Sequence, residues 1–300
     1  MRGMALARKL ALVVLASLAV ACASGGASPV AREWYDLGNA WLDKAEWKRA
    51  GEAYSRALAL DPGLGAASFN LARALAQAGD YDGALKVLDT LAAKDPGNVR
   101  IIAARAFALY KKGDAAAALA AYRKAVDLDP YSSDTVYNAA LLELSSGDAA
   151  AAAADLARLT SAKGEDGQAL LLLGRALDKV GGSDAAALAA YDKARALGKA
   201  DVDALARLAA LYEDARRFTD AMACLGEAVK ADPKRGAAWF SLARLRLVVA
   251  SDSDKGLEAL KSALDSGFSD KDAAKALLDQ PDLPDREKVF ELLKSKDLAE

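Results

Sequence analysis

The dipeptide Asp-Pro recurs in this chain at a fixed interval. Asp61-Pro62, Asp95-Pro96 and Asp129-Pro130 lie 34 residues apart, and Asp232-Pro233 follows after three more periods and one extra residue. Proline cannot continue a helix and disfavours helix in the residue before it, so each pair marks the end of a helix. Recurrence at about 20 to 50 residues is the signature of an array of stacked repeats. The period therefore predicts a repetitive all-helical chain.

Seven copies of the period follow one another, and the fifth and seventh carry one extra residue each, near Gly182 and near Asp252. The copies span 31–64, 65–98, 99–132, 133–166, 167–201, 202–235 and 236–270. Counted from residue 31, positions 8 and 20 are always small, which lets the two helices of a copy approach closely. Position 8 holds Gly38, Ala72, Ala106, Ala140, Gly174, Ala209 and Ala243, and position 20 holds Ala50, Ala84, Ala118, Ala152, Ala187, Ala221 and Gly256.

Glycine and aspartate mark the turn inside a copy. Gly79-Asp80, Gly113-Asp114 and Gly147-Asp148 combine a residue that suits a helix exit with one that suits the next N-cap. Each copy is therefore predicted to be a helix, a turn and a second helix.

The pattern resembles the tetratricopeptide repeat (TPR). The first copy holds the residues that carry the resemblance at positions 4, 7, 8, 11, 20, 24, 27 and 32, namely Trp34, Leu37, Gly38, Trp41, Ala50, Tyr54, Ala57 and Pro62. The resemblance implies an all-α fold, a right-handed α-solenoid of about seven repeats over 31–270. Two further helices, over 269–279 and 284–295, are expected to cap the exposed last repeat, so that 271–300 forms a C-terminal cap.

The fourth copy departs from the pattern. Its second helix begins with six alanines, 149–154, and Gly164 stands where proline is expected. Alanine favours helix but buries little area. We therefore expect the softest junction of the array between the fourth and fifth repeats.

The N-terminus has the form of an export signal. Arg2, Arg8 and Lys9 precede an uncharged apolar run of 12 residues, 10–21, which is shorter than the roughly 20 needed to span a bilayer. Residues 1–21 are therefore predicted to be a signal peptide.

The end of this run resembles a bacterial lipobox. Cys22 follows Ala21 directly and precedes a Gly/Ser/Ala-rich stretch. The resemblance implies that the Cys22 sulfur takes a lipid and that 22–30 forms a flexible tether. Ala19 stands where the family most often has leucine, and Ala19-Val20-Ala21 also fits ordinary signal peptidase. A soluble exported protein without lipid is thus the alternative.

Composition excludes several kinds of chemistry. The chain has 74 alanines, no histidine and two cysteines, so it lacks a Ser-His-Asp triad, a Cys-His pair and the usual zinc ligands. We find no catalytic motif and expect no cofactor and no metal.

The formal net charge is −2 and no basic run stands out, so no nucleic-acid partner is expected. Cys224 is predicted to be a packed, inert thiol, and Glu165 with Asp166 a loop pair.

The TPR resemblance implies where a partner would bind. In that family, positions 2, 5, 6, 9, 12 and 13 of each first helix line a concave groove. From these positions we select as binding candidates Tyr35, Asn39, Phe69, Asn70, Arg73, Phe107, Tyr110, Tyr137, Asn138, Arg175, Phe240 and Arg244. Aromatic residues at helical spacing also suit a core, and that alternative stays open. The carboxylate clamp of some TPR domains is not expected, because Tyr35 and Phe107 replace two of its basic residues.

These observations predict a membrane-tethered lipoprotein of the bacterial cell envelope, facing the periplasm or the cell surface. By resemblance, such proteins serve as pilotins or scaffolds for pilus, secretin or outer-membrane assembly, or as adaptors for peptidoglycan enzymes. The expected partner is a protein or peptide held in the groove. An exported helical enzyme or small-ligand-binding protein is the alternative from another class, and it would need a deep pocket with convergent acids.

Overall fold

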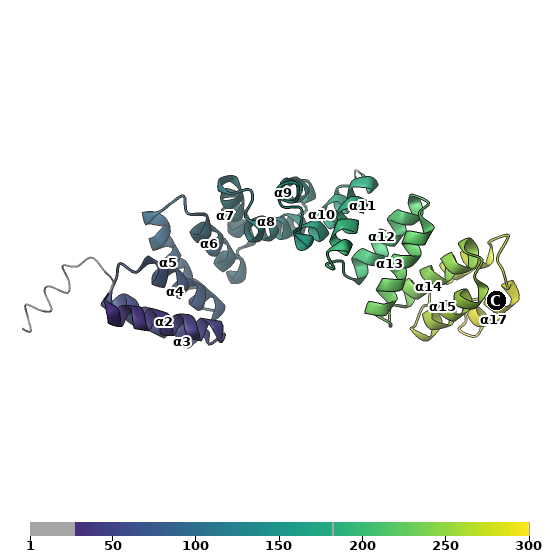
Figure 1. The fold of residues 1–300 in the computed structure, drawn as a ribbon, viewed down its shortest axis with the longest axis horizontal. Coiled ribbons are helices and arrows are strands. Elements are labelled where there is room, and N and C mark those ends of the chain that lie inside the picture. The colour runs from purple at the N-terminus through teal and green to yellow at the C-terminus, as the bar shows by residue number, and fades with distance from the viewer. Residues whose placement is uncertain (1–27, 182, 300) are drawn as a thin grey trace, which may run out of the picture. The chain divides into compact units, whose positions relative to one another are not determined.

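The computed structural model describes residues 28–181 and 183–299. These residues form sixteen α-helices, α2 to α17, and one short π-helix, η1, and they contain no strand (Figure 1). The α-helices are α2 (Pro29–Asp43), α3 (Trp47–Leu60), α4 (Gly65–Gln77), α5 (Tyr81–Lys94), α6 (Val99–Lys112), α7 (Ala115–Leu128), α8 (Ser133–Ser146), α9 (Ala149–Ala162), α10 (Gly167–Val180), α11 (Asp184–Ala196), α12 (Val202–Asp214), α13 (Phe218–Ala231), α14 (Gly236–Arg244), α15 (Ser253–Asp265), α16 (Lys271–Leu278) and α17 (Arg286–Lys294). The predicted all-helical fold is confirmed.

The chain divides into two compact units, Met1–Asp129 and Pro130–Glu300. In the first unit each helix from α2 to α7 packs against the next, and in the second unit the same holds from α8 to α15. The division falls at the end of the third repeat, one repeat earlier than the junction expected to be softest. At that expected junction α9 and α10 pack closely, and Leu156 and Leu159 of α9 are fully buried. The alanine run is thus followed by two leucines that are fully buried.

The small positions lie in helix interfaces. All residues at positions 8 and 20 are buried in all seven repeats. At Gly38 and Gly174 an added Cβ would lie 2.5 Å and 2.7 Å from the rings of Tyr54 and Tyr191, respectively. A tyrosine on the second helix therefore occupies the space that glycine leaves on the first.

The turn inside each repeat uses one left-handed residue. This residue is Ala45, Gly79, Gly113, Gly147, Gly181, Arg216 or Ser251, in chain order, with φ between 53° and 101°. Three of the next helices begin on the predicted side-chain caps Asp80, Asp114 and Asp148, whose carboxylates accept from backbone N–H groups three residues later at 2.9, 3.0 and 3.2 Å. The helices α3 and α13 begin without a side-chain cap. Four of the seven turns have glycine at the left-handed position, which explains why the glycine signal in the sequence is incomplete.

The two extra residues are accommodated in different ways. In the fifth repeat the addition lies in the turn, between the left-handed Gly181 and the N-cap Ser183. In the seventh repeat the first helix ends in η1 (Leu245–Val249), where Ala250 N–H donates to Leu245 C=O at 3.0 Å. An extra residue in an α-helix rotates everything after it by about 100°, and the wider π-turn absorbs that rotation. The addition therefore lies before Asp252, inside the helix.

The last repeat is covered by α16 and α17. Leu277, Leu283, Val289 and Leu293 are buried in one cluster with α14 and α15. The two helices lie within the ranges predicted from sequence, at 271–278 and 286–294.

The predicted signal peptide and Cys22 lie outside the described residues. Among the helices that the structure does describe, none has the length and apolar character needed to cross a membrane.

Candidate functional site

The candidate binding residues lie on the first helix of each repeat, on a stripe formed by positions 2, 5, 6, 9, 12 and 13 that we call the first-helix stripe. In the first unit these helices are α2, α4 and α6. Tyr110 is 49% exposed, while Phe69 and Phe107 are half-buried and contact the core formed by α4, α5 and α6. Tyr35 is half-buried against Tyr54, with ring centroids 5.9 Å apart. The aromatic residues therefore agree with both the core and the binding alternative, because Tyr35, Phe69 and Phe107 pack within the fold and Tyr110 faces solvent.

Two asparagines link the first two repeats. Tyr54 Oη donates to Asn39 Oδ1 at 2.7 Å, and Asn70 Nδ2 donates to the same oxygen at 3.1 Å. Burial raises the pKa of Tyr54 to about 12, with the Asn70 contact acting in the opposite direction. Asn39 and Asn70 are thus bonded to each other, and part of their hydrogen-bonding capacity is used within the fold.

Cations stand over the rings of the first-unit stripe. The Arg100 guanidinium lies 5.1 Å from the Phe69 ring centroid, and Lys111 Nζ lies 5.7 Å from that of Phe107. Arg73, Arg100 and Lys111 are all exposed. Arg100 and Lys111 stand at positions 2 and 13 of the stripe but outside the twelve selected candidates, and the four-residue spacing from Phe107 to Lys111 places both on one helix face.

The second-unit stripe differs in its chemistry. Tyr137 and Asn138 are half-buried. Arg175 pairs with Asp201, and Arg244 pairs with Glu213. Both guanidinium groups therefore already pair with carboxylates of the same unit.

Phe240 belongs to the core. It is 5% exposed, and its ring stacks on that of Phe268, with centroids 4.0 Å apart and planes 5° from parallel. Phe268 follows α15 within the last residues of the seventh copy, at a position to which the repeat pattern assigns no aromatic residue. Phe240 is therefore not an accessible binding residue.

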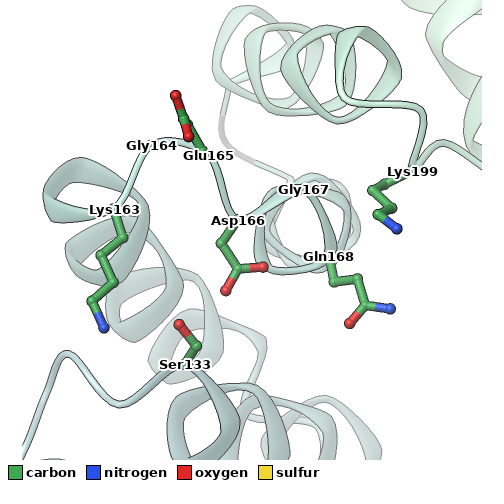
Figure 2. A pocket seen from close by; sticks show the side chains of 8 residues that line it. All are labelled: Ser133, Lys163, Gly164, Glu165, Asp166, Gly167, Gln168 and Lys199. Atoms are coloured by element: carbon green, nitrogen blue, oxygen red, sulfur yellow. The ribbon is translucent and has the colours of Figure 1, made fainter.

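An open polar pocket of about 720 Å³ lies beside the loop that follows α9 (Figure 2). Asp166 turns into it while Glu165 points away, as the view shows. Asp166 Oδ1 accepts from Ala169 N–H at 3.0 Å and caps α10, and Lys163 Nζ donates to Tyr131 C=O at 2.6 Å. The acids do not converge, and both polar groups support local structure, in agreement with the loop-pair interpretation.

Two other side chains that could react, Cys224 and Glu227, lie in surroundings that suit a structural role. Cys224 is fully buried, and burial raises the pKa of its thiol to about 11, so it stays protonated near neutral pH. Glu227 receives a hydrogen bond from Arg195, which lowers the pKa of that carboxyl, whereas a general acid needs a raised one. No group of three or more potential metal ligands gathers among residues 28–181 and 183–299.

Comparison with solved structures identifies similar folds. The chain is similar to a tetratricopeptide repeat protein from Parabacteroides merdae, with a TM-score of 0.53 and 17% identity over 83% of this chain and 98% of that one. It is also similar to PilF of Pseudomonas aeruginosa, with a TM-score of 0.58 and 19% identity over 68% and 92% of the two chains. YrrB, described as a TPR protein with an unusual peptide-binding site, has a TM-score of 0.54 and 20% identity over 63% and 96%.

Family models agree with these folds. Four models, each described as a tetratricopeptide repeat, match residues 42–106, 99–132, 137–202 and 202–245. No curated protein sequence matches the chain. The matched segments, the 34-residue period and the paired helices together make this chain a member of the tetratricopeptide repeat family.

Proposed function

We propose that this protein is a lipid-anchored adaptor of the bacterial cell envelope that binds a polypeptide segment of another protein through its first-helix stripe. The observation that carries the binding role is the exposed Tyr110, flanked by the half-buried Phe107 and by Lys111 on one face of α6. Aromatic anchors beside cations have the composition of interface hot spots. The TPR fold itself suggests a protein-interaction scaffold, and YrrB of similar fold is described as peptide-binding.

The envelope location rests on the N-terminal sequence alone. The basic residues before the apolar run and Cys22 at its end support export followed by lipidation. The partner would then belong to a pilus, secretin, outer-membrane or peptidoglycan assembly. No step of the proposed role is chemical: the stripe binds on a preformed surface and the lipid holds the protein at the membrane.

Two experiments test the proposal separately. Mass spectrometry of the mature N-terminus should find Cys22 as the first residue, carrying acyl chains. An unmodified Cys22 would rule out the anchor and favour the soluble exported adaptor.

The binding role is tested by crosslinking and co-purification from cell envelopes. Tyr110→Ala should lose partners that the wild-type protein retains, and the combined change of Tyr35, Phe69, Phe107 and Tyr110 to alanine should lose more. Leu128→Ala is the matched control, because Leu128 is also 49% exposed and lies on a second helix, α7. Unchanged partners for a folded Tyr110→Ala protein would contradict binding at this surface.

A further inference from the structure

The first-helix stripe carries two different charge arrangements. In repeats 5 to 7 its positions hold four cations, Arg175, Lys179, Arg207 and Arg244, and four acids, Asp178, Asp203, Glu213 and Asp214. In repeats 2 and 3 its positions hold three cations, Arg73, Arg100 and Lys111, and no acid. The stripe is therefore charge-balanced in repeats 5 to 7 and purely positive on α4 and α6.

Three of the four stripe cations in repeats 5 to 7 pair with acids, while Lys179 Nζ donates to the Leu144 carbonyl oxygen at 3.4 Å. Arg207 of the sixth repeat lies 2.8 Å from Asp178 of the fifth, and Arg244 of the seventh pairs with Glu213 of the sixth. Arg175 pairs with Asp201, the N-cap of α12. A ligand carboxylate approaching these arginines would have to displace one that is already in place.

The positive part has no such partner. No carboxylate among the described residues pairs with Arg73, Arg100 or Lys111. Neighbouring cations of α6 that lie outside the stripe form ion pairs: Arg105 lies 2.7 Å from Asp89, and Lys112 lies 2.6 Å from Asp82. The unit therefore pairs its cations on the sides of α6 and leaves those on the stripe available.

Two of the available cations are positioned by aromatic rings. Phe69 lies under Arg100 of the next repeat, and Phe107 lies under Lys111 on its own helix. A cation held over a ring has fewer rotamers to lose when it binds an anion. Each cation stands beside apolar surface, so a carboxylate and an apolar side chain of one ligand would be bound together.

We propose that repeats 2 and 3 bind an extended acidic peptide segment, with carboxylates on Arg73, Arg100 and Lys111 and an apolar side chain between them against Phe107 and Tyr110. The inference rests on the proposed function and adds the partner's chemistry and the repeats that recognise it. Neighbouring helices lie about 10 Å apart and an extended chain rises about 3.3 Å per residue. Carboxylates that bridge α4 and α6 should therefore be about three residues apart.

The segment is expected to be internal to its protein. Tyr35 and Phe107 stand where a clamp for a chain-terminal carboxylate needs basic residues, so side-chain carboxylates carry the binding. A free and an amidated C-terminus should then bind equally well.

The test uses the full-length chain, fluorescently labelled, on an array of random 12-residue peptides. Wild-type protein should enrich Asp and Glu together with Phe, Leu or Tyr. Peptides from the bound set, carried into fluorescence anisotropy, should bind the triple variant Arg73→Gln/Arg100→Gln/Lys111→Gln about threefold to 150-fold more weakly, since each of three exposed charge pairs contributes about 0.2–1 kcal/mol. Added salt should weaken wild-type binding.

The matched control is Lys86→Gln/Lys94→Gln/Lys124→Gln, which removes the same charge from exposed positions on the second helices of the same unit. It should bind as the wild type does. The acidic-partner inference is wrong if the bound peptides are apolar without acid enrichment, or if the triple variant binds acidic peptides as the wild type does. In that case, loss of partners in Tyr110→Ala would still support binding at the first-helix stripe. If no peptide binds and Tyr110→Ala keeps its partners, both proposals fail.

Discussion

The left-handed turn residue shows how a single position is constrained in seven contexts. A left-handed conformation costs an L-residue about 1–2 kcal/mol relative to the right-handed region, and glycine avoids that cost. Ala45, Arg216 and Ser251 nevertheless adopt it, with φ of 57°, 54° and 53°. These three turns therefore hold backbone strain that the other four do not.

Arg216→Gly should stabilise the protein by about 0.5–1 kcal/mol, because relief of strain exceeds the added freedom of the unfolded chain. The reciprocal change Gly113→Ala should destabilise it by a similar amount, since Gly113 has a φ of 101° and open space around it. Urea unfolding midpoints measure both. A lower midpoint for Arg216→Gly would contradict the assignment of strain to this turn.

Two helical glycines should respond to alanine with opposite signs. Gly38→Ala places a Cβ 2.5 Å from the buried Tyr54 ring and should destabilise the protein by about 1–3 kcal/mol. Gly226→Ala meets nothing within 4 Å in α13 and should stabilise it by about 0.5–1 kcal/mol. Thermal unfolding of the two variants makes the comparison, and a shared sign would show that helix propensity outweighs packing at Gly38.

Buried tyrosines give the protein a dependence on alkaline pH. Burial raises the pKa of Tyr122 to about 12, above the unfolded value of about 10. The folded state therefore keeps the proton more tightly, so this part of the stability is intact below pH 10 and is lost as the pH rises toward 12. Tyr122→Phe should make the unfolding free energy fall less steeply between about pH 10 and 12. Equal slopes for both proteins in urea titrations would contradict a buried, titrating phenol.

At the scale of single helices, the C-terminal cap shows how an array of repeats ends. Val289 and Leu293 of α17 are fully buried against the last repeat, while Glu287, Lys288 and Glu291 on the same helix are exposed. The helix thus covers apolar surface on one side and faces water on the other, as a terminal repeat requires.

Leu293→Ala should destabilise the protein by about 2–5 kcal/mol, because it removes a fully buried leucine from the cap cluster. Glu291→Ala, on the exposed side of α17, should change stability by no more than about 0.5 kcal/mol. Urea unfolding followed by circular dichroism distinguishes them. A small effect of Leu293→Ala would mean that the last repeat is stable without its cap.

Local chemistry made the helices and turns predictable, whereas contacts between repeats were not. The 34-residue period, the small residues and the Asp caps act within one repeat, so their spacing is visible in the sequence. The pair of Arg207 and Asp178 joins residues 29 positions apart and depends on side-chain rotamers. The extra residue of the seventh repeat was visible, but only backbone geometry places it in η1 rather than in the turn.

At the scale of the whole chain, the two units contain different binding and stabilising features. The available cations and the exposed Tyr110 lie in the first unit, while the inter-repeat ion pairs of the stripe and the terminal cap lie in the second. Repeat arrays are stabilised mainly by contacts between neighbours, so an array that divides into units can unfold in steps.

Urea unfolding of the protein should therefore show more than one transition. Gly38→Ala should shift the transition of the first unit, and Leu293→Ala should shift that of the second. Hydrogen exchange read by mass spectrometry assigns each transition to its helices. A single transition that both variants shift equally would show that the units unfold together.

The C-terminal cap formed by α16 and α17 also affects how a chain of this kind can gain repeats in evolution. A duplicated repeat added behind α17 would meet the charged surface of Glu287, Lys288 and Glu291 and would bury little. A copy inserted between two existing repeats would meet apolar faces on both sides. Growth by duplication is thus favoured in the interior of the array, and the terminal segment would be inherited unchanged while the number of repeats before it varied.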